Sequence, residues 1–142
     1  MENNTLALIA VVEDQAPVAM ALLRLLRSCG FAAEAFASGP AFLDWVHGNR
    51  PDCIILDIHM PHMSGVEVKE HLMAGHRSLP TIFITASDDP DDEQRALQAN
   101  PVCLLHKPFT ADQLLTAIRT ALNPRIGLKS NSANRPSSCI KG

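Results

Sequence analysis

Short, continuous apolar runs alternate along this chain with longer stretches in which apolar residues recur every three or four positions. Continuous apolar runs of strand length are typical of strands buried on both faces, whereas a spacing of three or four residues is that of an amphipathic helix. On this basis five strands are predicted, at residues 6–12, 31–36, 53–56, 81–85 and 102–105.

A helix is predicted to follow each strand. The first continues up to Gly30, a typical helix stop, and the second opens at residues 38–40, which read Ser-Gly-Pro. The third and fifth begin at residues 64–67 and 110–113 with the patterns S-x-x-E and T-x-x-Q, which are capping boxes. The apolar positions of the first helix are Val18, Ala21, Leu22, Leu25, Leu26 and Cys29.

The helix predicted between Asp88 and Asn100 has little apolar surface. Its apolar anchors are Ala96, Leu97 and Ala99, and the same stretch contains five acidic residues. Most of a helix's stability in a folded protein comes from packing its apolar face. We therefore expect this helix to be the most mobile element.

Five buried strands, each followed by a helix, predict an α/β fold: a doubly wound (βα)5 parallel sheet covered by helices on both faces. A chain of 142 residues is long enough for one domain with a real core. We expect that domain at residues 1–123. Residues 124–142, which are rich in Ser, Asn, Pro and basic side chains, are expected to form a disordered tail.

Composition narrows the class of protein. No apolar stretch approaches the ~20 residues that span a bilayer, and the first 15 residues lack the basic region and cleavage pattern of a signal peptide. The four cysteines are scattered at no metal-binding spacing, which indicates reduced thiols. We therefore expect a cytoplasmic protein that does not associate with a membrane.

The net charge of −3 conceals an asymmetry. Residues 124–142 carry four basic and no acidic residues, so the part before them holds 8 basic and 15 acidic residues, a net charge of −7. An acidic body argues against a nucleic-acid-binding surface. Direct DNA binding is therefore not expected.

Reactive side chains are concentrated where the predicted strands end. The first strand is followed by Glu13 and Asp14, the third by Asp57, the fourth ends at Thr85, and the fifth leads to Lys107. The carboxyl ends of parallel strands meet at one edge of a sheet, where ligand sites form. Clustered carboxylates repel one another unless a cation such as Mg²⁺ is bound. One carboxylate can then attack phosphorus while a lysine and a hydroxyl contact the phosphoryl group.

These residues and the motifs around them resemble the receiver domain of two-component response regulators. The motifs are Glu13-Asp14, DIHMPHMSG from Asp57 onward, Thr85-Ala86 and Lys107-Pro108-Phe109, and the resemblance covers residues 6–123. The stretches PDCIILDIHMPHMSG, LPTIFITA and HKPF are particularly similar to receivers of the FixJ type. The resemblance implies a flavodoxin-like sheet with the strand order 2-1-3-4-5.

The resemblance also implies a phosphoryl-accepting centre. Asp57 would be the phosphoacceptor. Asp14, Asp57 and the backbone carbonyl of His59 would hold Mg²⁺, with Glu13 holding it through water.

Further roles follow from the same resemblance. Thr85, with Ala86 beside it, would supply the switch hydroxyl, and Lys107 would bind the phosphoryl group, with a cis peptide bond to Pro108. Receivers usually carry Tyr or Phe three residues before this lysine, whereas this chain has Leu104. We therefore expect the switch to act through the loop after the fourth strand and the helix behind it.

On this resemblance the chain would accept a phosphoryl group from a sensor histidine kinase or a histidine phosphotransfer protein. It would act on a downstream protein, could form a homodimer, and would catalyse only its own phosphotransfer and slow autodephosphorylation. FixJ-type proteins carry a DNA-binding domain after the receiver. The 20 residues after Leu122 are too few for one, so the chain looks like a single-domain regulator or a receiver cut from something larger.

Two alternatives stay open. A phosphohydrolase of the haloacid-dehalogenase kind also uses Asp, Mg²⁺, Thr and Lys, but it has a second Asp two residues after the nucleophile, where this chain has His59. A phosphorylation-independent interaction module could use the fold only as a scaffold, although every acceptor-site residue is present. A dinucleotide-binding domain is excluded because no G-x-G-x-x-G follows the first strand.

Overall fold

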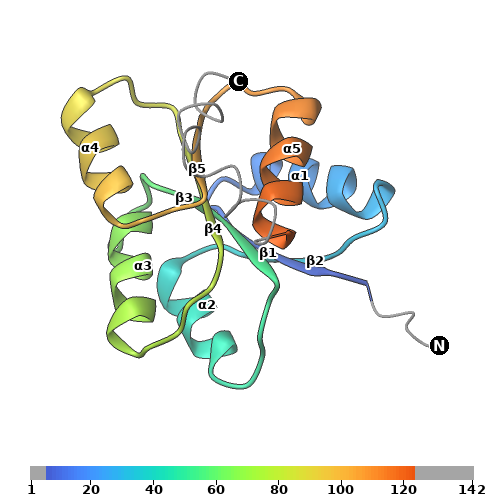
Figure 1. Cartoon of the computed structure of the whole chain (residues 1–142), viewed down its shortest axis with the longest axis horizontal. Coiled ribbons are helices and arrows are strands. Elements are labelled where there is room, and N and C mark those ends of the chain that lie inside the picture. The colour runs from blue at the N-terminus through green and yellow to red at the C-terminus, as the bar shows by residue number, and fades with distance from the viewer. Residues whose placement is uncertain (1–5, 124–142) are drawn as a thin grey trace.

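The computed structural model describes residues 6–123, which form a five-stranded sheet in the order β2-β1-β3-β4-β5 (Figure 1). All four strand pairings are parallel, and the order confirms the predicted doubly wound (βα)5 fold. The predicted tail at 124–142 lies outside the described residues. The elements are β1 Leu8–Val12, α1 Ala16–Ser28, β2 Ala32–Phe36, α2 Gly39–Val46, β3 Cys53–Asp57, α3 Gly65–Ala74, β4 Thr81–Thr85, α4 Pro90–Gln98, β5 Cys103–His106 and α5 Ala111–Leu122.

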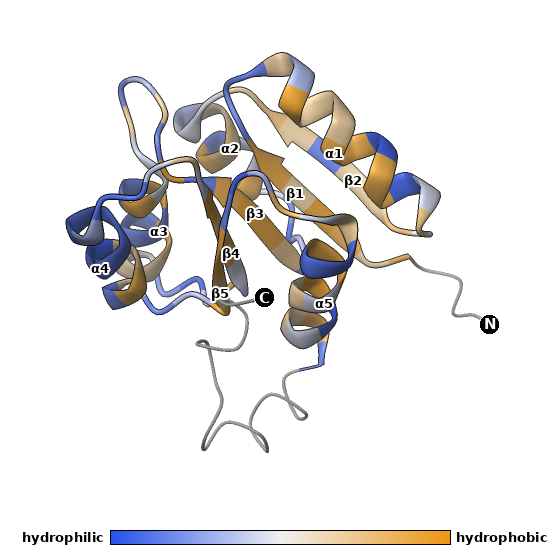
Figure 2. Cartoon of the chain, turned by 90° about the horizontal axis from the view of Figure 1, so that it is seen from above, coloured by the Kyte–Doolittle hydropathy of each residue, from blue (hydrophilic) through white to orange (hydrophobic). Residues whose placement is uncertain are grey.

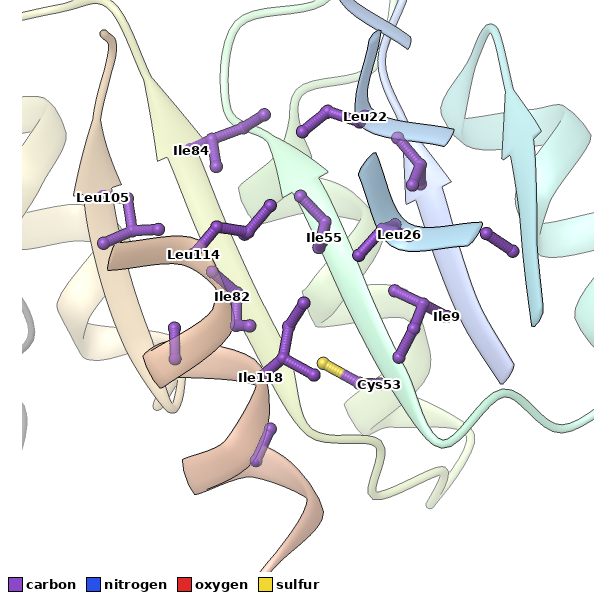
Figure 3. Packing of buried hydrophobic residues seen from close by; sticks show 14 of the residues in the cluster. Ile9, Leu22, Leu26, Cys53, Ile55, Ile82, Ile84, Leu105, Leu114 and Ile118 are labelled. Atoms are coloured by element: carbon purple, nitrogen blue, oxygen red, sulfur yellow. The ribbon is translucent and has the colours of Figure 1, made fainter. Parts of the chain in front are cut away.

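Helices cover both faces of the sheet, with α1 and α5 on one face and α2, α3 and α4 on the other (Figure 1). Alternate side chains of each strand point to opposite faces, so the sheet separates two apolar layers. In the first layer, Ile55 and Ile82 pack beneath Leu26 of α1 and Ile118 of α5 (Figure 3). The second layer includes Phe42 of α2, which is fully buried.

The strand register aligns the carboxyl ends of the central strands. Val12 of β1 pairs with Leu56 of β3, and Thr85 of β4 pairs with His106 of β5. The residue after Val12 therefore lies beside Asp57, which is the last residue of β3. In this way the sheet gathers the strand ends at one edge.

Helix starts follow the capping signals in the sequence. The Ser64 and Thr110 hydroxyls each accept a hydrogen bond from the backbone N–H three residues later. The Glu67 and Gln113 side chains in turn accept from the backbone N–H of Ser64 and Thr110, so both predicted capping boxes are confirmed. In α2, the Ser38 hydroxyl accepts from the Ala41 N–H. These bonds satisfy backbone donors that the first turn of a helix leaves unpaired.

The buried face of α1 differs from the prediction. Ala21 and Cys29 are exposed, because Ala21 lies beside the buried stripe and Cys29 follows the last helical residue. The chain then turns at Gly30, whose φ of +92° is a conformation that glycine adopts without a steric penalty. The buried residues follow the i, i+3, i+4, i+7 spacing and are Ala19, Leu22, Leu23 and Leu26.

Helix α4 has few apolar contacts. Ala96 is its buried residue, and Ala99 is buried just beyond its end. The prediction that Leu97 anchors the helix is wrong, since this side chain is 37% exposed. Its neighbour Ala96 takes the inward position, and the next residue of a helix points about 100° away. Figure 2 shows α4 as a largely hydrophilic helix, whereas the strands are hydrophobic.

Among the described residues, every helix is too short or too polar to cross a membrane. Cys53 is buried in β3, where burial raises the pKa of its thiol to about 12. A thiol with so high a pKa is unreactive near neutral pH, which agrees with a packing role.

Candidate functional site

Three carboxylates meet at the carboxyl edge of the sheet. Glu13 and Asp14 follow β1, and Asp57 ends β3. One oxygen from each lies within 4.8 Å of the oxygens of the other two. Glu13 and Asp57 are buried, at 1% and 4% exposure, whereas Asp14 is partly exposed. The three residues that the sequence predicted as acidic ligands are therefore together in space.

Lys107 brings a positive charge to these carboxylates from the loop after β5. Its Nζ lies 3.0 Å from Glu13 Oε1 and 3.5 Å from Asp57 Oδ2. The backbone N–H of Lys107 donates to the Thr85 carbonyl at 2.7 Å, which extends the strand pairing to this residue. The peptide bond between Lys107 and Pro108 is cis, the isomer that the resemblance implies.

Local backbone contacts hold Asp57 in place. The His59 N–H donates to Asp57 Oδ1 at 3.2 Å, and the Gly65 N–H donates to the Ile58 carbonyl at 2.9 Å. A Cβ atom at position 65 would collide with the Asp57 carbonyl oxygen. Glycine at Gly65 therefore lets α3 begin directly against the end of β3.

The electrostatics of the site raise the pKa of Asp57 to about 7 from its ordinary value of 3.8. Burial is the largest cause, followed by the hydrogen bond to Glu13 and the negative charge of Glu13. Lys107 and the His59 N–H act in the opposite direction. Three carboxylates thus face one ammonium group, and the excess negative charge favours the binding of a cation.

The donor set fits Mg²⁺. This ion prefers oxygen ligands, is bound through one or two carboxylates, and keeps several waters. Glu13, Asp14 and Asp57 offer carboxylate oxygens, and the carbonyl of His59 was predicted as a further ligand. Mg²⁺ would lower the electrostatic cost of ionising Asp57 and would leave coordination positions for phosphate oxygens.

Thr85 is the last residue of β4, the strand that pairs with β3, and Ala86 follows it in the loop. Thr85 is buried, and its Oγ1 accepts a hydrogen bond from the Ser87 N–H at 2.9 Å, whereas Ala86 is exposed. Leu104 is fully buried in β5, pairs with Phe83 of β4, and belongs to the apolar layer beneath α2, α3 and α4. Its side chain therefore already occupies an inward position.

Comparison with known proteins identifies the family. The sequence profile of the response regulator receiver domain matches residues 9–119. The chain belongs to this family. The response regulator protein TodT of Pseudomonas putida is 36% identical over 130 residues, which cover 92% of this chain and 57% of TodT. The chain spans about half the length of the curated relatives it matches.

Solved receiver structures have the same fold. The structure of FixJ-N is 31% identical, with a TM-score of 0.78 over 87% of this chain and 96% of that one. A response regulator receiver protein from Burkholderia phymatum is 41% identical, with a TM-score of 0.73 over 82% of this chain and 95% of that one. Receiver domains bind Mg²⁺ in an acidic pocket, and this receiver has such an acidic cluster.

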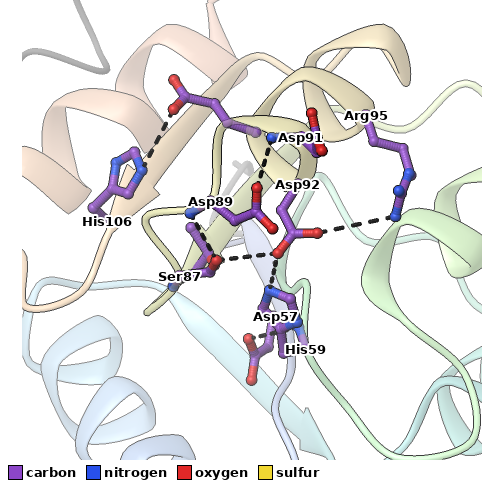
Figure 4. Close-up of polar contacts among 10 residues, drawn as sticks. Asp57, His59, Ser87, Asp89, Asp91, Asp92, Arg95 and His106 are labelled. Carbon is purple, nitrogen blue, oxygen red and sulfur yellow. Dashed lines mark hydrogen bonds and ion pairs between the residues drawn. The ribbon is translucent and has the colours of Figure 1, made fainter.

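One part of the site was not found by sequence reasoning. The His59 imidazole of this receiver lies 3.2 Å from Asp92 of α4, and Asp92 also accepts a hydrogen bond from Ser87 (Figure 4). The role predicted for His59, as a ligand of Mg²⁺, concerns its backbone carbonyl. The acidic run after the fourth strand was the available signal, but the sequence does not state which of its carboxylates faces the acceptor loop.

Proposed function

We propose that this receiver domain is a phosphorylation switch in which Asp57 accepts a phosphoryl group from a histidine kinase or a histidine phosphotransfer protein in a Mg²⁺-dependent reaction. The observation that carries the proposal is that Asp57 lies beside the carboxylates of Glu13 and Asp14 and within 3.5 Å of the ammonium group of Lys107. A nucleophile, a set of cation ligands and a fixed positive charge are the groups that phosphoryl transfer requires.

The chemistry starts from the ionised carboxylate of Asp57. One Oδ attacks phosphorus, the bond from phosphorus to the donor nitrogen breaks, and its electron pair stays on the imidazole, which takes up a proton. The product is an acyl phosphate. Mg²⁺, when bound, neutralises charge on the phosphoryl oxygens. The Lys107 ammonium group is near enough to Asp57, at 3.5 Å, to contact the same oxygens.

The Thr85 hydroxyl is proposed to bind the transferred phosphoryl group. A hydroxyl can donate one hydrogen bond and accept two. In this structure Thr85 Oγ1 accepts from the Ser87 N–H. Rotating Oγ1 toward the Asp57 side would take it away from that N–H, so the state of the acceptor would be communicated to the β4–α4 loop.

A groove on the α1 side is the proposed docking surface for the phosphodonor protein. Its volume is about 410 Å³, and it lies between α1 and the start of α5. An apolar groove of this kind suits the side chains of a partner helix. It is lined by Pro17, Val18, Ala21, Leu22, Leu25, Phe109 and Ala111. Ala21 was predicted to be an apolar position of the first helix, but it is exposed. Its exposure in the groove is consistent with a docking role.

We further propose that this domain acts on a downstream protein in the cytoplasm. It is not proposed to bind DNA directly. Receiver domains are in general signalling modules rather than enzymes. The phosphohydrolase alternative would need an acid two residues after Asp57, where His59 stands instead. A homodimer remains compatible with the proposal but is not required by it.

Labelling tests the proposed function. The protein is incubated with a small-molecule phosphodonor and Mg²⁺, and the adduct is mapped by mass spectrometry. The wild type should gain one acid-labile, hydroxylamine-sensitive phosphoryl group, and Asp57→Asn should gain none because an amide is not a competent nucleophile. The control Asp44→Asn changes an exposed carboxylate of α2. Normal labelling of Asp57→Asn would refute the assignment.

A further inference from the structure

Polar contacts attach the first turn of α4 to the rest of the domain. The apolar contribution of this helix is small, since Ala96 is its buried residue. In the first turn, Asp92 Oδ2 lies 3.2 Å from His59 Nε2 and 3.0 Å from Ser87 Oγ (Figure 4). One carboxylate oxygen of α4 therefore contacts both the loop after β3 and the loop after β4.

Each of these two loops also contacts the acceptor site. The backbone N–H of His59 donates to Asp57 Oδ1 at 3.2 Å, and that of Ser87 donates to Thr85 Oγ1 at 2.9 Å. Asp92 thus connects two chains of polar contacts into one path: one chain runs from the Asp57 carboxylate through His59 and one from the Thr85 hydroxyl through Ser87. The path is drawn in part in Figure 4, where Asp92 lies between His59 and Ser87.

We propose that Asp92 couples α4 to the acceptor site, holding the helix while the site is unphosphorylated and releasing it when a phosphoryl group is present. This inference rests on the proposed function of Asp57 and Thr85. It assigns to Asp92 a positioning role, because its carboxylate acts through His59 and Ser87 and does not touch Asp57.

The release follows from what phosphoryl transfer does to the two ends of the path. Transfer converts Asp57 into an acyl phosphate, and the Thr85 hydroxyl is recruited to the phosphoryl group. Asp57 Oδ1 and Thr85 Oγ1, which accept hydrogen bonds from the His59 and Ser87 N–H groups, therefore belong to the groups whose partners change on phosphorylation. Once both loops rearrange, few contacts remain to hold α4.

The N-cap residue Asp89 also connects α4 to the loop after β4, since its N–H donates to Ser87 Oγ at 3.0 Å. The remaining ion pairs of α4 are longer than the one between Asp92 and His59. Arg95 Nη1 lies 3.9 Å from Asp92 Oδ1 within the helix, and His106 Nε2 lies 3.9 Å from Glu93 Oε1. Both are beyond hydrogen-bonding distance. Asp89 reaches the loop after β4, whereas Asp92 contacts that loop and also His59 in the loop after β3, so we assign the connection between α4 and both loops to Asp92.

The consequence for partners concerns the cleft between α3 and α4. This cleft has a volume of about 490 Å³, and both His59 and Asp92 line it. Moving Asp92 would change its shape and the distribution of charge along it. The phosphorylation state of Asp57 would thereby alter a surface that a downstream protein can contact.

Amide exchange with solvent tests the coupling. In the unphosphorylated protein, Asp92→Ala should increase the exchange rates of amides 94–99 by about tenfold, the effect of losing one hydrogen-bonded charged group. Asp91→Ala is the matched control, because it removes an acid from the same turn whose carboxylate is exposed and lies outside the path. The amides of β3 and β4 should keep wild-type rates in both variants.

The same measurement with beryllofluoride, a phosphoryl mimic, separates coupling from a merely structural role. The mimic should accelerate exchange of α4 in the wild type and in Asp91→Ala but add little in Asp92→Ala, whose helix is already released. An equal response in all three proteins overturns the proposal, as does α4 exchange in Asp92→Ala that matches Asp91→Ala.

Two further results keep the outcomes distinct. If Asp92→Ala perturbs β3 as well, His59→Ala decides the matter. It removes the imidazole that contacts Asp92 and keeps the backbone N–H that donates to Asp57, so it must accelerate α4 exchange, and wild-type rates overturn the proposal. Labelling of Asp57 is followed in parallel. If Asp57 of the wild type is not labelled, the proposed function is refuted. If it is labelled but α4 amide exchange is the same with and without the mimic, only the coupling is refuted.

Discussion

The Nζ of Lys107 lies 3.0 Å from Oε1 of Glu13, nearer than its distance of 3.5 Å to Asp57 Oδ2. The lysine thus pairs first with the fully buried Glu13 side chain and only second with the nucleophile. This arrangement leaves Asp57 with less compensation for its burial, and it agrees with the raised pKa of the Asp57 carboxyl.

Glu13 is therefore predicted to control the ionisation of Asp57. Glu13→Gln removes the negative charge that disfavours ionisation and frees Lys107 to turn toward Asp57. The pKa of Asp57 should fall from about 7 toward its ordinary value. A carbon-13 NMR titration of the Asp57 carboxyl, in the absence of divalent cations, measures this pKa. Glu34→Gln, at an exposed position of β2, is the control. An unchanged pKa in Glu13→Gln would contradict the prediction.

The raised pKa of Asp57 predicts a pH-dependent stability. Between about pH 4 and pH 7 the folded protein retains a proton on Asp57 that the unfolded chain has lost, so the free energy of unfolding falls as pH rises through this window. In Asp57→Asn the side chain cannot ionise, so the variant's free energy of unfolding does not fall in this window. It should gain on the order of 1–3 kcal/mol over the wild type at about pH 8 and little at about pH 4, in urea unfolding with a chelator present.

The outcome against this prediction is a stability difference between Asp57→Asn and the wild type that is the same at both pH values. Saturating Mg²⁺ should reduce the difference at the higher pH, because an ion bound only by the folded wild type stabilises it. The variant lacks one carboxylate ligand and should respond less.

Asp14 is predicted to be a direct ligand of Mg²⁺. Asp14→Ala removes an oxygen donor from the three-carboxylate cluster and should weaken Mg²⁺ binding by about tenfold or more. An NMR titration with Mg²⁺ measures the affinity. Asp112→Ala, in the exposed first turn of α5, controls for the change in net charge. Equal affinities for the wild type and Asp14→Ala would exclude direct ligation.

Arg24 is predicted to contribute to docking of the phosphodonor protein. It is exposed on α1, near the proposed groove, whereas the exposed Arg27 donates to the Ala33 carbonyl at 2.7 Å and so also serves the fold. Arg24→Glu should slow transfer from the cognate histidine protein by about tenfold, because charges at an interface rim act mainly on the association rate. Labelling by a small-molecule donor should stay normal. Loss of both activities would indicate misfolding instead.

The switch is predicted to act through α4 rather than through Leu104. Leu104 is already fully buried, so it has no exposed position from which to swing inward. A phosphoryl mimic should therefore shift the amide resonances from Thr85 to Asn100 more than those beside Leu104. A shift map centred on β5, with residues 87–97 unchanged, would show that this view of the switch is mistaken.

The sequence by itself determined the elements, their order and the chemistry of the site. Buried parallel strands carry continuous apolar runs, and capping boxes mark helix starts at Ser64 and Thr110, so local patterns were sufficient to predict them. Parallel strands place their carboxyl ends together, so the sequence positions of Glu13, Asp57 and Lys107 already implied one cluster.

The tertiary structure decided how the side chains pair and which helix faces are buried. Lys107 could have contacted either acid, and its preference for Glu13 depends on angles that spacing does not encode. Leu97 points outward because a helix with so few apolar residues does not specify its own rotation about its axis. The contact between His59 and Asp92 joins residues 33 positions apart whose distance is set by how α4 packs, and only the folded chain determines that.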